Sequence, residues 1–102
     1  MRIIELDALN WRTPLDFESA LKTALGAPEW HGSSVGAFVD SMVAGGVNLL
    51  EPPYLIKAVN ATKLAPEVID LVRAIPSAVE RTRLRRFART GEEVAVSLTI
   101  AN

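Results

Sequence analysis

The chain has 102 residues, of which 49% are hydrophobic and 23% charged, a composition typical of folded proteins and far from that of disordered chains. This length supports one modest core, so we expect a single domain over residues 1–102. The chain contains no cysteine, which excludes disulfides, thiolate zinc sites and thiol catalysis and suits the cytoplasm. No apolar run approaches the roughly 18 residues of a membrane span.

The net charge of −1 conceals an uneven distribution of charge along the chain. Residues 1–51 carry seven acids and three bases, whereas residues 52–102 carry five acids and eight bases. Five of these bases are arginines within nine residues, Arg81, Arg83, Arg85, Arg86 and Arg89. Such an asymmetry bears on how partners approach and orient, and it says nothing about the fold.

The first two elements follow from local sequence signals. Residues 2–6 are mainly β-branched or apolar and predict a short strand. A helix is then indicated by Thr13 as its cap, by Pro14 in its first turn and by Gly26 at its end.

A non-periodic connector over residues 27–32 leads to a second helix, capped by Ser33 or Ser34. Its apolar residues recur at helical spacing and predict a core face, formed by Val35, Phe38, Val39 and Met42. Gly36 and Asp40 lie one turn apart and point away from that face. This helix therefore presents a second surface.

The second half of the chain predicts a central strand over residues 54–59 and a final strand over residues 94–100. A helical pattern begins at Pro66, is interrupted by Pro76 and restarts at residues 77–80, a capping-box candidate, to reach about Thr90. We expect a kinked or paired helix. Strands separated by helices predict an α/β fold: a three-stranded parallel sheet with helices packed on it, in the order β-α-α-β-α-β.

The sequence gives little support for a catalytic function. His31 is the only histidine, it lies in a connector, and the chain has no G-x-S-x-G motif. Gly45 and Gly46 lack the lysine and hydroxyl residue of a phosphate-binding loop. One histidine with scattered acids does not supply a metal site. We therefore expect no enzymatic activity, no metal and no cofactor.

The arginine cluster has two interpretations. Arg81, Arg85 and Arg89 fall on one side of a helix and could bind phosphates. Alternatively they form the solvated side of an amphipathic helix whose core side contains Leu84 and Phe87. We favour the second interpretation, because the acidic first half of the chain would repel a nucleic acid.

The segment from Leu25 to Met42 resembles the signature of the barstar family, whose members are intracellular protein inhibitors of secreted ribonucleases. The shared features are a leucine, a Pro-Glu pair, two aromatic rings, a glycine and a helix with an aspartate followed by a small residue. Asp40 stands eight residues after Gly32, as that pattern requires. The resemblance implies the family's fold, with a parallel three-stranded sheet.

The resemblance also implies that Asp40 enters a ribonuclease active site and imitates a substrate phosphate. An exposed acid on a capped helix can by itself pair with clustered arginine and lysine of a partner. Trp30 and His31 correspond to the family's aromatic pair, and rigid rings are good anchors. The alternatives are a solvated surface acid for Asp40 and a core or rim residue for Trp30.

Two features depart from the family pattern. Gly36 stands where the family has an acid one turn before Asp40. The last helix is rich in arginine, whereas the family places acids there, near the inhibitory surface. The candidate targets therefore include other nucleases and proteins that are not nucleases.

These features together predict a cytoplasmic protein-binding module that inhibits a ribonuclease or a related toxin. The expected contact residues are Trp30, His31, Ser34, Gly36, Val39, Asp40 and Val43. The expected partner is a protein, with a basic ribonuclease as the leading candidate, and not a membrane. The alternative is a barstar-fold interaction domain without nuclease inhibition, which binds another protein, or with less support a nucleic acid, through its arginine-rich helix.

Overall fold

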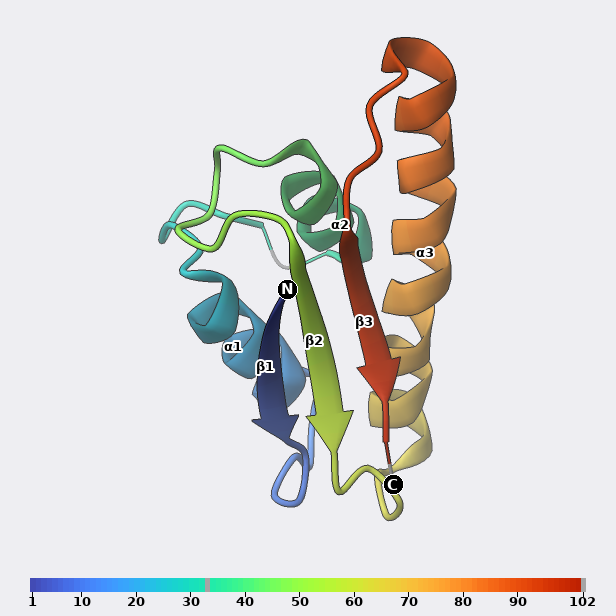
Figure 1. Ribbon diagram of the computed structural model, residues 1–102. Helices are drawn as coiled ribbons and strands as arrows, with labels where there is room; N and C mark the ends of the chain where they lie inside the picture. The colour runs from blue at the N-terminus through green and yellow to red at the C-terminus, as the bar shows by residue number, and fades with distance from the viewer. Residues whose placement is uncertain (33, 102) are drawn as a thin grey trace.

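The structure is a computed structural model that describes residues 1–32 and 34–101. Within these ranges, three strands and three helices follow one another in the order β1, α1, α2, β2, α3, β3 (Figure 1). Their bounds are Arg2–Asp7 (β1), Pro14–Leu25 (α1), Val35–Ala44 (α2), Tyr54–Val59 (β2), Pro66–Thr90 (α3) and Val96–Ile100 (β3). The predicted order of elements is confirmed, although β3 begins two residues later than the alternating pattern indicated.

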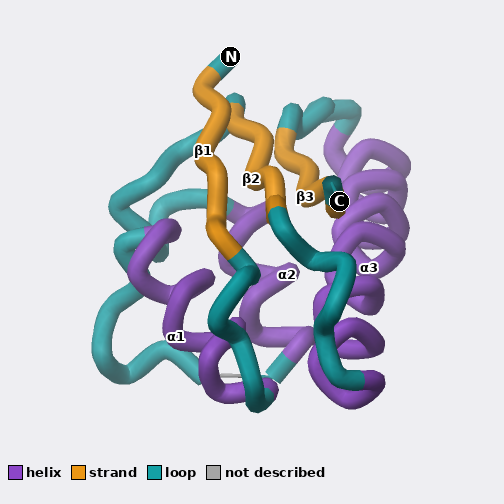
Figure 2. Tube along the Cα trace, turned by 90° about the horizontal axis from the view of Figure 1, so that it is seen from below, coloured by secondary structure: helices purple, strands orange, loops and turns teal. Residues whose placement is uncertain are grey.

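The three strands form one parallel sheet with β2 in the middle. Ile4 of β1 pairs in register with Ile56 of β2, which in turn pairs with Leu98 of β3. The helices gather on one side of this sheet, with α3 alongside β3 (Figure 2). Tyr54 and Ile56 are fully buried on that side, and burial raises the pKa of the Tyr54 hydroxyl. The core therefore lies between the sheet and the helices, as the predicted α/β class requires.

The start of α1 is held by a side chain of its own first turn. Thr13 is the N-cap, and the Asp16 carboxylate accepts hydrogen bonds from the backbone N–H groups of Arg12 and Thr13, at 2.8 and 3.0 Å. These bonds lower the pKa of Asp16, because they stabilise its charged form. Gly26 ends the helix with φ 63°, the left-handed conformation that favours glycine.

Substitution of Asp16 by asparagine is expected to destabilise the protein at pH 7 and to have little effect in acid. A carboxyl whose pKa is lower in the folded state stabilises that state above its unfolded pKa and loses this contribution as the pH falls. Urea unfolding at pH 7 and at pH 3 measures the difference. A Glu18→Gln variant of the same helix is the control, and equal pH dependence of the two variants would contradict the assignment.

The helix α3 runs without interruption from Pro66 to Thr90, with Pro76 inside it. Of the expected kinked or paired helix, the paired form, with a restart at the capping box of residues 77–80, is therefore wrong. Proline removes one helical hydrogen bond, but α3 is held on both sides of it by apolar residues that face the core. These residues are Val68, Val72, Ile75 and Val79, all buried.

The last turns of α3 do not bury the face that the amphipathic pattern predicts. Leu84 and Phe87 are 61% and 51% exposed, so they do not form a core side. The side chains of Arg83 and Arg86 are only 23% and 24% exposed. The buried face of the earlier turns, which ends at Val79, continues at about 100° per residue through these arginines. Because this part of α3 extends beyond the sheet (Figure 1), there is no core to cover Leu84 and Phe87.

Candidate functional site

The helix α2 is fixed by its cap and by its buried face. Ser34 is the N-cap, and its hydroxyl accepts a hydrogen bond from the backbone N–H of Ala37 at 3.1 Å. Ser33, the other predicted cap, lies outside the described residues. The buried residues of α2 are Phe38, Val39, Ser41, Met42 and Val43. Its position and rotation are therefore set by the core.

The opposite face of α2 carries a single charge among small residues. Gly36, Asp40 and Ala44 are exposed and follow one another at a spacing of four residues. Glycine and alanine extend little from the helix, so the Asp40 carboxylate projects alone from this face. None of the described ion pairs involves Asp40.

The connector before α2 carries the most exposed aromatic side chain of the described residues, Trp30, which is 78% exposed. His31, its neighbour, is instead 5% exposed, and its ring packs on Phe38 with a centroid distance of 5.3 Å. The backbone N–H of His31 also donates to the Pro28 carbonyl at 3.0 Å. His31 thus anchors the connector to α2, and Trp30 is displayed beside it.

A buried polar cluster holds the connector, α2 and the segment after α2 together. His31 Nε2 lies 2.7 Å from Ser41 Oγ, and His31 Nδ1 bonds to the Gly32 carbonyl oxygen. Ser41 Oγ donates to the Phe38 carbonyl at 3.0 Å and accepts from Asn48 Nδ2 at 3.1 Å. The structure thus brings a serine and the histidine together, a pair that the sequence did not indicate. Because Ser41 is 7% exposed and bonded on three sides, we interpret the cluster as a structural anchor.

One side of α2 borders an apolar groove of about 240 Å³. Its lining residues come from the connector, from α2 and from the segment that follows α2. They are Trp30, His31, Gly32, Ala37, Asp40, Ser41, Ala44 and Val47. Trp30 and Asp40 are both among the residues that line this apolar groove, which suits an amphipathic side chain of a partner.

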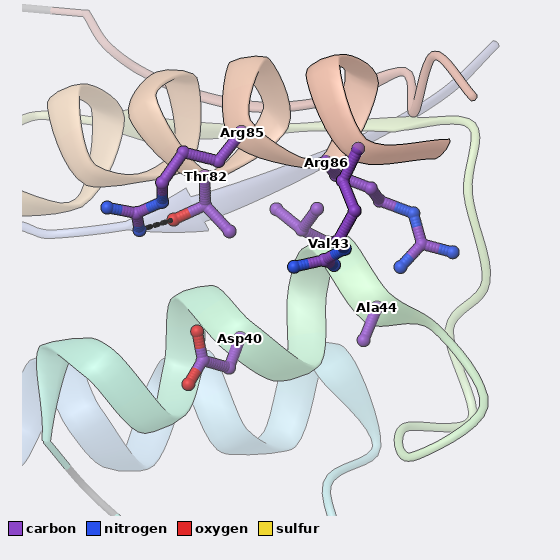
Figure 3. Close-up of a pocket in the computed structure, with 7 residues that line it drawn as sticks. Asp40, Val43, Ala44, Thr82, Arg85 and Arg86 are labelled. Atoms are coloured by element: carbon purple, nitrogen blue, oxygen red, sulfur yellow. Dashed lines mark hydrogen bonds between the residues drawn. The ribbon is translucent and has the colours of Figure 1, made fainter. Parts of the chain in front are cut away.

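The other side of α2 borders a cleft of about 250 Å³ against α3, the arginine cleft (Figure 3). It is lined by Asp40, Val43, Ala44, Thr82, Arg85, Arg86 and Arg89. Figure 3 shows Asp40 on α2, across the cleft from Arg85 and Thr82 on α3. Asp40 and Ala44 line both hollows, so α2 forms a low ridge between an apolar groove and a cationic cleft.

The guanidinium groups of the arginine cleft are only partly paired. Arg86 Nη2 lies 3.4 Å from Glu92 Oε2, an ion pair in which Glu92 is 65% exposed. Arg85 Nη2 donates to the Thr82 hydroxyl at 3.2 Å. Within the described residues, Arg85 and Arg89 form no ion pair. Positive charge therefore exceeds negative charge in this concave region.

The predicted contact residues fall into two groups. Trp30, Ser34, Gly36 and Asp40 are exposed and share the surface around the connector and α2. The other three are buried: His31, Val39 and Val43, at 5%, 2% and 3% exposed. Val39 is a core residue, because it lies on the helix face that packs inward. His31 and Val43 support the floors of the apolar groove and the arginine cleft.

The sequence did not indicate the groups that surround Asp40. The sequence pattern predicts a solvated helix face for Arg85 and Arg89, and it gives no role to Val47. The spacing of these residues along the chain does not indicate that α3 lies beside α2, because that contact arises from packing between segments that are distant in the sequence. A stripe of arginine at a spacing of four residues was the only local indication.

A search for clusters of His, Asp and Glu side chains that could hold a metal ion finds none among residues 1–32 and 34–101. Over the same residues, no helix is long and apolar enough to span a membrane.

Comparison with models of known protein families gives no match for this chain, and comparison with curated proteins gives none either. The fold and the two hollows define a small α/β domain with a three-stranded parallel sheet and a charged ridge, α2, between an apolar groove and a cationic cleft.

Proposed function

We propose that the protein is a binding module for another protein and that it docks through α2 and the connector before it. The observation that carries this proposal is the position of Asp40, an exposed carboxylate on the ridge that borders both the apolar groove and the arginine cleft. Trp30 adds a large exposed side chain that also lines the apolar groove. A basic side chain of a partner that pairs with Asp40 would bury its aliphatic stem in this groove.

The resemblance of the segment from Leu25 to Met42 to the barstar family supports a more specific function, inhibition of a ribonuclease or a related toxin. In this proposal Asp40 enters the cationic active site of the target and occupies the place of a substrate phosphate. The chain would then act in the cytoplasm, where it would protect the cell from the enzyme that it binds.

Capture from the native cell tests this proposal. Immobilised wild-type protein is compared with an Asp40→Ala variant and with Asp70→Ala, a matched loss of an exposed acid from α3. We expect one protein to be retained by the wild type and by Asp70→Ala and to be lost with Asp40→Ala. The purified partner is then assayed for ribonuclease activity with and without the domain. A captured protein that all three baits retain equally would contradict the role of Asp40.

Replacement of Gly36 by glutamate is expected to strengthen binding to a basic partner by about three- to tenfold. Gly36 is exposed, and a Cβ atom there would meet only the Ser34 hydroxyl, at 3.9 Å, so the helix backbone leaves room for a side chain to begin at this position. The new acid lies one turn from Asp40 and doubles the negative charge of the ridge. Titration calorimetry with the captured partner measures the change, and Gly36→Gln controls for added side-chain contacts. An equal gain with glutamine would show that charge is not responsible.

A second candidate function is supported by the exposed apolar residues of α3. Leu84 and Phe87 are 61% and 51% exposed and lie near the arginines of the same helix. This surface favours an interaction domain without nuclease inhibition, which binds another protein through α3. A Leu84→Ser/Phe87→Ser bait that loses the captured protein, while Asp40→Ala retains it, would support this candidate over the first.

A further inference from the structure

The arginine cleft is a concave site whose charge is not neutralised by the protein itself. Arg85 and Arg89 form no ion pair within the described residues, and Arg85 donates only to the Thr82 hydroxyl. One carboxylate, that of Asp40, lines the cleft with three guanidinium groups, and Glu92 reaches only Arg86. Positive potential is focused where low-dielectric walls surround it, so this cleft attracts an anion.

We propose that the arginine cleft binds a carboxylate side chain of the protein partner. This inference rests on the proposed function and defines the partner's chemistry. A guanidinium group binds a carboxylate through two parallel N–H···O bonds. Within residues 1–32 and 34–101, Arg85 uses one nitrogen for Thr82 and neither Arg85 nor Arg89 pairs with a carboxylate. The volume of the cleft, about 250 Å³, suits an aspartate or glutamate side chain.

The position of the cleft favours a protein carboxylate over a row of nucleic-acid phosphates. Asp40 lies on one side of the cleft (Figure 3), and Glu92 and Glu93 follow Gly91, the C-cap of α3. A continuous phosphate backbone along α3 would approach these acids, whereas a single carboxylate enters between them and the arginines. The apolar groove begins on the other side of Ala44, so one protein segment lying across α2 fills both hollows.

The partner surface is therefore expected to carry both signs of charge. A basic side chain faces Asp40, and an acidic side chain enters between Arg85 and Arg89. This arrangement fixes the orientation of the partner, because rotating it about α2 would bring like charges together. It also distinguishes the expected partner from a uniformly basic surface.

The test uses pentaglutamate as a probe, with inorganic phosphate and a short single-stranded oligouridylate as parallel arms. Binding is followed by nuclear magnetic resonance through the Nε–Hε signals of the arginine side chains. We expect pentaglutamate to shift the signals of Arg85 and Arg89 in a saturable manner and to bind about tenfold more weakly to Arg85→Gln/Arg89→Gln. Asp40→Asn is expected to bind it about two- to threefold more tightly, because a like charge is removed.

The control is Arg2→Gln/Arg73→Gln, which removes the same charge from exposed positions outside the cleft. An equal loss of binding in both double variants would overturn the proposal, as would the absence of any shift at Arg85 and Arg89. Tighter binding of phosphate or oligouridylate, dependent on the same arginines, would also overturn it and assign the cleft to phosphates. Failure here is separable from failure of the proposed function, which is tested by Asp40→Ala and the captured partner.

Discussion

Replacement of Phe38 by alanine is expected to lower the free energy of unfolding by about 3–5 kcal/mol. Phe38 is 1% exposed, and its ring packs against that of His31 beneath the connector. Alanine would leave a cavity between α2 and the connector and remove much of a buried aromatic surface. Since small domains are stable by about 5–15 kcal/mol, the variant would lose a large share of its stability. Urea unfolding followed by circular dichroism measures the loss.

The matched control for this prediction is Phe87→Ala. Phe87 is 51% exposed on α3, so the same chemical change removes little buried surface and is expected to cost less than about 1 kcal/mol. The comparison also tests the orientation of α3, because the sequence pattern had predicted Phe87 in the core. Equal losses of unfolding free energy in the two variants would contradict the difference in burial between Phe38 and Phe87.

Most elements of the fold could be predicted because their signals are local. Thr13 and Gly26 bound α1, and the mainly apolar run over residues 54–59 predicts a central strand, in which the structure buries every second side chain. Such signals involve residues within one or two turns of each other, so a sequence pattern contains them. The strand order also followed, because parallel strands joined by helices leave few alternatives.

The orientation of α3 could not be predicted in the same way. Leu84 and Phe87 are apolar and spaced for one helix face, which ordinarily indicates a buried face. The phase of α3 is instead set by its longer first part, whose buried residues include Val72 and Val79. Continuing that phase places Arg86 inward, where its aliphatic stem lies against the protein and its guanidinium reaches Glu92.

The candidate site likewise contains some residues that local sequence signals predict and others that only the packing of distant segments brings together. Asp40 and Trp30 were predicted from features within one segment, namely helical spacing and a non-periodic connector, and the structure shows both exposed. The arginine cleft was not predicted, because it forms only where α3 lies beside α2. In the sequence, the arginines of the last helix are a departure from the acidic surface that the barstar family has there. In the folded protein Arg85 and Arg89 border the same ridge as Asp40, so the surface is mixed in charge.

Replacement of Asp40 by alanine is expected to weaken binding of the captured partner by about 2 kcal/mol or more, which is roughly thirtyfold in the dissociation constant. The physical reason is that Asp40 is the only charge on the exposed face of α2 formed with Gly36 and Ala44. A basic group buried against this ridge would lose its one carboxylate and remain unpaired. Titration calorimetry with the purified partner measures the change.

The Asp40→Ala variant is also expected to fold normally, which keeps the binding result interpretable. Asp40 takes part in none of the described ion pairs, so its loss should change the free energy of unfolding by no more than about 0.5 kcal/mol. Asp70→Ala, which removes an exposed acid from α3, is expected to change the affinity less than about threefold through long-range electrostatics alone. A thirtyfold loss confined to Asp40→Ala would identify its carboxylate as a direct contact. Equal affinities for the wild type and both variants would rule out the ridge as the binding surface.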